Sequence, residues 1–430
     1  MHIFFSGIGG AAIGPLALIA KQAGYEVSGS DIAASASINY LKKRGITDIT
    51  IGQTTEQIEK IHTERPIDWL VYSSALPKTN PDHPELVFAK DNGIKLSRRD
   101  EFINVLIKDK NLKLIAIAGT HGKTTATAMV IWLLKQLDIP VSYSVGGKIN
   151  FGEMGVFDPA SKYFVYEADE YDRNFLSFFP YLSIISGLDY DHPDTYPTQA
   201  SYDDAFREFI DQSGKTFAWH EDAERLGLAQ DSKITVLDEK SQAIDEQLTL
   251  AGHVNRKNAW LVVEAIAHGL GSHTANLLGG MNRFPGVARR FEQIAPNIYS
   301  DYAHTPPKIA GALQQAHELA GNNVVVVYEG LHNTRQHFIK SKLANLFDEV
   351  KQLYIVPSYL AREDPSLELL PPAKLLNLLS NVSKEHAQSA SLDNKLLSNI
   401  KNHAADGDLV LCLSAGGAGS LDEWMRKELL

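Results

Sequence analysis

The segment 112–127, LKLIAIAGTHGKTTAT, limits more than any other the folds that this chain can adopt. An apolar run of strand length leads into a glycine-containing loop, and the residues after the loop are apolar nearly all round. A buried strand, a tight loop and a buried helix in this order are typical of a parallel α/β sheet. Further strands are predicted at 163–168 and 182–190, whereas the polar segment 214–250 is predicted to be irregular.

Strand-like and helix-like segments alternate along the whole chain of 430 residues, which is too long for one ordinary core. In the last third, NVVVVYE, LYIVPSY and DLVLCLSAGG are predicted strands, with KSKLANLFDEV and AKLLNLLSNV as helices between them. We therefore predict an α/β protein with three domains, at 1–107, 108–282 and 283–430.

Composition excludes several classes of protein. The net charge of -11 argues against a chain that coats nucleic acid. A single cysteine, Cys412, excludes a disulfide within the chain and predicts a reducing cytoplasm, with the thiol as a small core residue. No stretch is apolar for long enough to cross a membrane. The N-terminus is apolar, but it lacks Lys and Arg before the apolar run and contains four glycines, so a strand, a turn and a helix are expected.

The glycine-containing loop of 112–127 is a candidate phosphate site. The usual pattern has a glycine five residues before the second loop glycine, where this chain has Ile117. The strand before the loop and the helix after it nevertheless favour phosphate binding, with Lys123 against the terminal phosphates and Thr124 on a Mg²⁺ ion. The residues predicted to hold the nucleotide here are Gly119, Thr120, His121, Gly122, Lys123, Thr124 and Thr125.

Two acidic segments end predicted strands, namely YEADEYDRNF with Glu167 and Glu170, and GLDYDHPDTY with Asp189 and His192. The carboxyl ends of parallel strands meet at one edge of a sheet, so both segments are expected beside the phosphate loop. Mg²⁺ prefers oxygen ligands, which makes Glu167 the natural ligand and His192 an unusual one. Taken singly, each segment is more typical of a solvated loop than of a metal site.

The predicted domain 1–107 contains the pattern Gly7-x-Gly9-x-x-Ala12, followed by Asp31 at the end of its second predicted strand. This spacing suits a dinucleotide or a nucleotide sugar, although glycines that only form a tight turn give the same pattern. In the predicted domain 283–430, Arg289 and Arg290 are either a surface charge pair or contacts to phosphates.

Taken together, these segments resemble the ATP-dependent Mur ligases of bacterial peptidoglycan synthesis, over essentially the whole chain. The resemblance rests on GIGG, SSAL with NPDHPEL, SRRDEF, AGTHGKTT, EADEYD, DYDHPDTY, GHVNRKNA, GVARRFE, DYAHTPPKI and the terminal LSAGG. In that family AGT-x-GKT is the normal ATP loop. The resemblance implies a Rossmann-like domain for a UDP-sugar, a central P-loop ATPase and a C-terminal Rossmann-like domain that helps to bind an amino acid or peptide.

The chemistry implied by the resemblance is phosphorylation of a substrate carboxylate by ATP with Mg²⁺. An amine then attacks the acyl phosphate and gives an amide, ADP and phosphate. The residues implied to be catalytic are Lys123, Glu167, His192, Asp301 and His304, with Thr124, Glu167 and His192 as metal ligands.

Other positions carried over from the family bind ligands. The implied further contacts to ATP are Asn255, Asn258 and Arg289. The implied contacts to substrate are Gly7, Gly9, Gly10, Asp31, Ser73, Ser74 and Arg335.

The GxGG loop is similar to the subgroup that joins an amino acid or peptide directly to UDP-N-acetylmuramate. SRRDEF, HPDTY and SYLAREDP favour L-alanine as the amine, whereas EADEYD and SAGGAGSLDEW favour the tripeptide L-Ala-γ-D-Glu-meso-diaminopimelate. The chain departs from the family at Gly187 (often Asn), Val254 (His), Thr305 (His) and Gly330-Leu331 (Pro-His). Alternatives of another class are a catalytically silent UDP-sugar-binding protein and an NAD-binding oxidoreductase.

Overall fold

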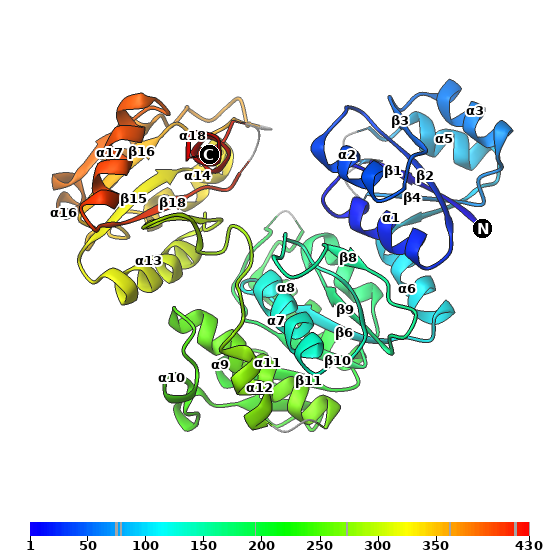
Figure 1. The fold of residues 1–430 in the computed structure, drawn as a ribbon, viewed down its shortest axis with the longest axis horizontal. Coiled ribbons are helices and arrows are strands. Elements are labelled where there is room, and N and C mark those ends of the chain that lie inside the picture. Colours follow the sequence, from blue (N-terminus) through cyan, green and yellow to red (C-terminus); the bar gives the residue numbers. More distant parts are fainter. Residues whose placement is uncertain are drawn as a thin grey trace. The chain divides into compact units, whose positions relative to one another are not determined.

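The computed structural model describes residues 1–73, 76–77, 80–193, 195–271, 274–360, 363–416 and 419–429, with the side chains of 274 and 275 left aside. The chain divides into two compact units. One contains Met1–Ala243 and Asn258–Phe284, and the other contains Ile244–Lys257 and Pro285–Leu430. The first unit holds two sheets and the second unit holds one (Figure 1). The predicted α/β fold class is confirmed, and it is built on three sheets.

The first sheet is parallel, with the strand order β3-β2-β1-β4-β5. Its strands are β1 (His2–Ser6), β2 (Glu26–Asp31), β3 (Ile49–Ile51), β4 (Trp69–Tyr72) and β5 (Lys95–Arg98). Its helices are α1 (Ile13–Gln22), α2 (Ala36–Lys43), α3 (Thr55–Glu64), α5 (Pro84–Asp91) and α6 (Arg99–Asp109). The apolar N-terminus therefore forms the strand, turn and helix that its glycines predict.

The second sheet has the order β12-β11-β10-β6-β9-β7-β8, and only β7 and β8 pair antiparallel. Its strands are β6 (Lys113–Ala118), β7 (Val141–Ser144), β8 (Gly155–Val156), β9 (Tyr163–Glu167), β10 (Leu182–Ile185), β11 (Thr216–Trp219) and β12 (Ile234–Leu237). The helical segments are α7 (Lys123–Gln136), η1 (Tyr171–Ser177), α8 (Gln199–Gln212), α9 (His220–Arg225), η2 (Glu239–Ser241) and α12 (Thr274–Met281). Two further helices, α10 (Ile244–Gln247) and α11 (His253–Leu270), include residues of the second unit.

The prediction that 214–250 is irregular was wrong, because β11 and β12 extend the second sheet there. Each has four residues, and β11 is buried on both faces. Such short strands between polar turns leave no alternation of apolar and polar residues to detect.

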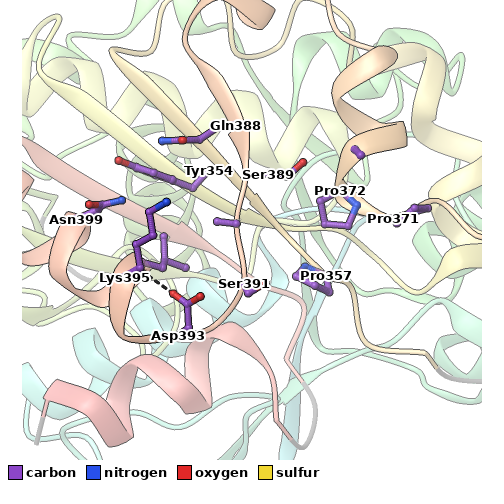
Figure 2. Close-up of a pocket in the computed structure, with 13 residues that line it drawn as sticks. Tyr354, Pro357, Pro371, Pro372, Gln388, Ser389, Ser391, Asp393, Lys395 and Asn399 are labelled. Atoms are coloured by element: carbon purple, nitrogen blue, oxygen red, sulfur yellow. Dashed lines mark hydrogen bonds between the residues drawn. The ribbon is translucent and has the colours of Figure 1, made fainter.

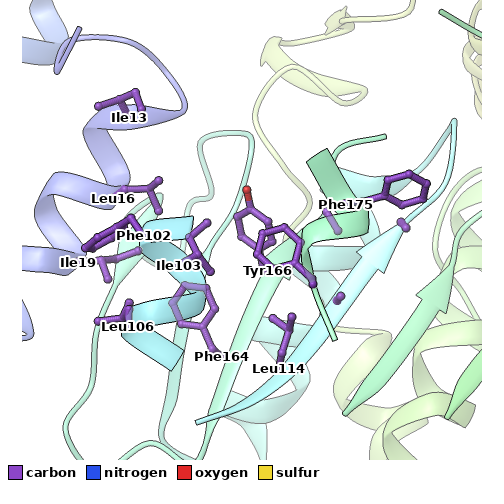
Figure 3. Close-up of a cluster of buried hydrophobic side chains, with 14 of the residues drawn as sticks. Ile13, Leu16, Ile19, Phe102, Ile103, Leu106, Leu114, Phe164, Tyr166 and Phe175 are labelled. Atoms are coloured by element: carbon purple, nitrogen blue, oxygen red, sulfur yellow. The ribbon is translucent and has the colours of Figure 1, made fainter. Parts of the chain in front are cut away.

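Helix α6 is part of the core that joins the two sheets of the first unit. Phe102 and Leu106 on α6 belong to the same buried cluster as Leu16 on α1 and Phe164 on β9 (Figure 3). The Phe102 ring also meets that of Phe5 edge to face, with 5.5 Å between the centroids. This shared core positions the phosphate loop within the first unit.

The sheet of the second unit has the order β13-β14-β18-β15-β16-β17, with β13 and β14 antiparallel and the remaining pairs parallel. Its strands are β13 (Glu292–Ala295), β14 (Ile298–Asp301), β15 (Val324–Glu329), β16 (Gln352–Val356), β17 (Ala387–Ser389) and β18 (Leu409–Leu413). Its helical segments are α13 (Pro306–Ala320), α14 (Asn333–Ile339), η3 (Lys340–Lys342), α15 (Pro372–Asn377), α16 (Asn381–Glu385), α17 (Asn394–Ala405) and α18 (Leu421–Leu429).

Two predicted helices of this unit were wrong in extent. KSKLANLFDEV forms only the short η3 and turns, because Ala344 O accepts the Ser380 N–H (2.7 Å) and Asp348 accepts the Ser383 hydroxyl (2.6 Å). AKLLNLLSNV is divided into α15 and α16 where Ser380 caps the second helix. Both segments thus replace helical hydrogen bonds with contacts to each other.

Two predictions from the composition concern the Cys412 thiol and membrane-spanning helices. Cys412 is fully buried on β18, as expected, and burial raises the pKa of its thiol to about 12. Among the described residues, no helix is both long and apolar enough to cross a bilayer.

Candidate active site

The phosphate loop connects β6 to α7 and is shaped by two glycines. Gly119 has φ +137°, and a Cβ at this position would come within 2.6 Å of Ser186 Oγ and 2.9 Å of Gly187 O. Gly122 caps α7 in the left-handed region, at φ 78°. The loop therefore passes so close to the end of β10 that a side chain at Gly119 would force the loop to shift.

Thr120 anchors the loop to the protein. Its N–H donates to Gly187 O (2.8 Å), and its hydroxyl lies 2.7 Å from Asp189 O and 2.6 Å from the buried Tyr202 hydroxyl. The predicted contact of Thr120 with a nucleotide would require one of these bonds to open. The neighbouring His121 ring lies 3.4 Å from the Asp189 carboxylate, and Thr125 lies on the first turn of α7.

Lys123 forms a nearly buried ion pair with Glu170. Lys123 Nζ donates to Glu170 Oε2 (2.6 Å) and to Gly119 O (2.7 Å), and the two side chains are 15% and 1% exposed. Burial opposes both charges, but each stabilises the other, so the pKa of Lys123 is raised. The Lys123 charge and a hydrogen bond from His192 likewise outweigh burial and lower the pKa of Glu170 to about 2. The pair is charged at neutral pH.

His192 reaches the same carboxylate from the segment after β10. Its Nε2 lies 3.6 Å from Glu170 Oε1, and its ring meets that of Tyr171 edge to face at 5.1 Å. The Tyr196 hydroxyl donates to Glu170 O (2.6 Å). The two acidic segments thus meet beside the loop, as the shared sheet edge predicts, while Asp194 lies outside the described residues.

Thr124 and Glu167 lie side by side at the C-terminal end of β9. Thr124 Oγ1 donates to Glu167 Oε1 (2.9 Å), and Glu167 Oε2 accepts the Gly146 N–H (2.8 Å). Three or more metal-binding side chains do not gather anywhere in the described part of the chain. One hydroxyl and one carboxylate still suit Mg²⁺, which usually takes its other ligands from water and substrate phosphates. The predicted ligand His192 contacts Glu170 rather than this pair.

The two asparagines predicted to contact ATP lie in different units. Asn258 is buried against the phosphate loop, where a Cβ on Gly122 would come within 2.8 Å of its Nδ2. Asn255 belongs to the second unit, and its Nδ2 donates to Ala251 O (3.0 Å) and Gln315 Oε1 (3.2 Å).

In the first sheet, the glycine loop is closed by its own contacts. Gly7 has φ +76°, its N–H donates to Ser30 O (2.9 Å), and the Gly10 N–H donates to Gly7 O (3.0 Å). Asp31 Oδ2 accepts the Gly9 N–H at 2.8 Å. The predicted substrate residue Ser73 follows β4, and Ser74 lies outside the described residues.

In the second unit, Asp301 and His304 follow one another at the C-terminal end of β14. Asp301 accepts the N–H groups of Phe291 and Ala303, both at 2.6 Å. Burial raises the pKa of Asp301, although the nearby Arg290 charge opposes this shift. Burial and then the Lys308 charge lower the pKa of His304 to about 4, so its imidazole is neutral at pH 7.

Cationic side chains surround His304 in this unit. The guanidinium groups of Arg289 and Arg290 lie 4.7 and 4.9 Å from the centroid of the Tyr302 ring. Arg289 also pairs with Asp422 at 3.3 Å. Arg335 is exposed and has no ion-pair partner among the described residues, and its charge helps to lower the pKa of His304. An anion would therefore be attracted to this face.

Comparisons with known proteins identify the family. The model of the Mur ligase family, catalytic domain, matches residues 2–111, and that of the Mur ligase, glutamate ligase domain, matches 289–416. UDP-N-acetylmuramate–L-alanine ligase of Clostridium acetobutylicum is 30% identical over 98% of this chain and 96% of its own. The chain belongs to the Mur ligase family. The enzyme of the same name from Clostridium tetani is 30% identical to this Mur ligase, over 96% of this chain and 95% of its own.

Solved structures share the fold of this Mur ligase. UDP-N-acetylmuramate–alanine ligase of Thermotoga maritima covers 100% of this chain and 98% of its own, at 23% identity and a TM-score of 0.77. A murein peptide ligase of Psychrobacter arcticus covers the same shares at 24% identity and a TM-score of 0.65. Mur ligases are ATP-dependent, which agrees with the phosphate loop.

Sequence reasoning did not predict two roles in this Mur ligase. The sequence predicts Glu170 only as one of several acidic residues at a strand end, not as the ion-pair partner of Lys123. It predicts no role for Tyr202. The only available signal for Glu170 was its place at the end of a strand next to the P-loop strand. Nothing in the local sequence around Tyr202, which lies on α8, indicates its bond to Thr120.

Proposed function

We propose that this Mur ligase joins L-alanine to the carboxylate of UDP-N-acetylmuramate at the expense of ATP. The observation that carries the proposal is the full-length identity to ligases of that name, combined with a phosphate loop whose Lys123 is fixed and charged. We assign the UDP-sugar to residues 1–107, ATP to 108–282 and the amine to 283–430.

The chain's own residues would act by position and charge. Lys123 holds a fixed positive charge where the terminal phosphates of ATP would lie, so it would stabilise the charge of the transferring phosphoryl group. Mg²⁺ held by Thr124 and Glu167 would neutralise phosphate charge. Neutral His304 would hold or accept a proton near the amine, and Arg335 would attract an anionic group.

The test offers the full-length protein ATP, Mg²⁺ and UDP-N-acetylmuramate with one amine at a time. We expect phosphate release that requires both the UDP-sugar and L-alanine, and a product with the mass of UDP-N-acetylmuramoyl-L-alanine. Turnover only with the tripeptide L-Ala-γ-D-Glu-meso-diaminopimelate would replace the amine in the proposal. UDP-sugar binding without turnover for any amine would contradict it.

A further inference from the structure

A cavity of about 210 Å³ lies in the second unit, next to residues that follow β15 and β16. Leucine and proline side chains form most of its wall, including Leu331, Leu369 and Pro372. Leu369 is 54% exposed, so part of this apolar wall faces solvent. The cavity therefore has room and surface for an apolar group that enters from outside.

A second cavity of about 420 Å³ shares Pro357, Pro371 and Pro372 with the first one, and these prolines form part of both walls (Figure 2). Its remaining lining is mixed, with Gln388 and Lys395 beside apolar residues such as Leu396. The smaller cavity therefore has the more uniformly apolar lining of the two.

One buried polar group in the smaller cavity lacks a partner. Gln336 is 1% exposed, and its Oε1 accepts the Leu331 N–H (2.9 Å) and the Tyr328 hydroxyl (3.3 Å). These two donors fix the orientation of the amide. Its Nε2 has no hydrogen-bond partner among the described residues. A buried donor without an acceptor is costly, so an oxygen atom of a ligand would complete this site.

Two adjacent residues, Gly330 and Leu331, shape one side of the cavity. Leu331 is 4% exposed and forms part of the wall. At Gly330, a Cβ would come within 2.7 Å of Ser358 Oγ and 2.8 Å of Gln336 Oε1. Glycine and leucine at these positions thus give the space and the apolar surface.

One cationic side chain, Arg335, acts on Tyr359 next to this wall without lining the cavity itself. Arg335 immediately precedes Gln336 in α14 and carries no ion pair among the described residues. Tyr359, between the wall residues Ser358 and Leu360, contacts the His332 ring with 6.4 Å between the centroids. A ligand with an apolar body and a carboxylate therefore matches both the cavity and its surroundings.

We propose that this cavity receives the side chain of the incoming amino acid, so that the enzyme accepts apolar L-amino acids larger than L-alanine. The inference rests on the proposed function and defines its amine substrates more closely. The cavity of about 210 Å³ has room for several water molecules, each of which needs about 10–15 Å³ of such space. The methyl group of L-alanine would therefore fill only a small part of it. The carboxylate of the amino acid would accept from Gln336 Nε2.

The test measures kcat/KM of the full-length enzyme for L-alanine, L-2-aminobutyrate, L-valine and L-leucine, with ATP, Mg²⁺ and UDP-N-acetylmuramate. We expect values for L-valine and L-leucine within about tenfold of that for L-alanine, because a pocket shaped for a methyl group discriminates by about 10–200-fold per added methylene. Turnover of L-alanine with a loss of more than about tenfold for L-leucine would overturn the inference and leave the proposed function intact. Absence of turnover with every amine would instead overturn the proposed function.

A pair of variants ties the result to the cavity. Leu369→Trp places a bulky ring at its exposed edge, and Leu319→Trp makes the same change on α13, at a side chain of similar exposure outside the cavity. We expect Leu369→Trp to lower kcat/KM for L-leucine at least about tenfold more than for L-alanine. Leu319→Trp should leave the ratio unchanged. Equal losses for both amino acids in Leu369→Trp would contradict the assignment.

Discussion

The phosphate loop of the first unit and the cationic face around His304 in the second unit differ in how their charged side chains are paired. Lys123 is buried against Glu170, and Thr124 against Glu167, so the groups that are expected to meet ATP already bind one another. Around His304, by contrast, cations gather and Arg335 has no ion-pair partner among the residues described. The difference indicates that the first region is organised by the protein itself, whereas the second awaits an anionic substrate.

Removing the cation of the phosphate loop should have the largest effect on activity. We expect Lys123→Ala to lower kcat by about a thousandfold or more, because a fixed charge on the transferring phosphoryl group is lost. Binding of UDP-N-acetylmuramate, measured by calorimetry, should stay nearly unchanged. Equal loss of turnover and of UDP-sugar binding would mean that the two sites are not separate.

Breaking the Lys123–Glu170 pair from the other side tests whether the protein organises this region. Glu170→Gln leaves Lys123 buried without its counter-charge, and the free energy of unfolding should fall by about 3–5 kcal/mol. Asp204→Asn is the control, because it breaks the exposed pair with Arg207 and should cost less than about 1 kcal/mol. Urea unfolding of both variants measures the difference, and similar small losses would show that the buried pair contributes little.

Lowering the pH should destabilise the folded protein through His304 in the second unit. Since the pKa of His304 is lowered to about 4 in the folded chain from 6.5, the unfolded chain binds the extra proton first as the pH falls. Stability should therefore decrease between pH 6.5 and 4, by up to about 3 kcal/mol from this group. The variant His304→Gln should lose correspondingly less over the same range in urea unfolding. Identical pH dependence of the two proteins would exclude this contribution.

The smallest expected effect concerns the shape of the phosphate loop. Gly119→Ala places a Cβ against Ser186 and Gly187, whereas Gly227→Ala shares the positive φ but has nothing within 4 Å. Both changes should lower the free energy of unfolding by about 1–3 kcal/mol, because alanine is strained at a positive φ. Only Gly119→Ala should also raise the KM for ATP, because its loop must shift. An unchanged KM for ATP in Gly119→Ala would show that the close approach to β10 is not required.

The fold and the phosphate loop were largely predictable because their signals are local. The strand, loop and helix at 112–127 and the acidic residue Glu167 at a strand end follow from periodicity and sheet topology. The pairing of Lys123 with Glu170 was not predictable, because 47 residues separate them and several carboxylates nearby were equally eligible. The cavity beside Gln336 depends on the path of segment 357–372, which no local pattern specifies.

The central claim is that the phosphate loop delivers the γ-phosphate of ATP to the muramic acid carboxylate. UDP-N-acetylmuramate labelled with ¹⁸O in that carboxylate tests it directly, by mass spectrometry of the phosphate released during turnover with L-alanine. An acyl phosphate intermediate predicts that each phosphate carries one ¹⁸O atom from the carboxylate, because the amine displaces phosphate together with that oxygen. Phosphate free of ¹⁸O, formed at the same rate as the amide product, would contradict the claim.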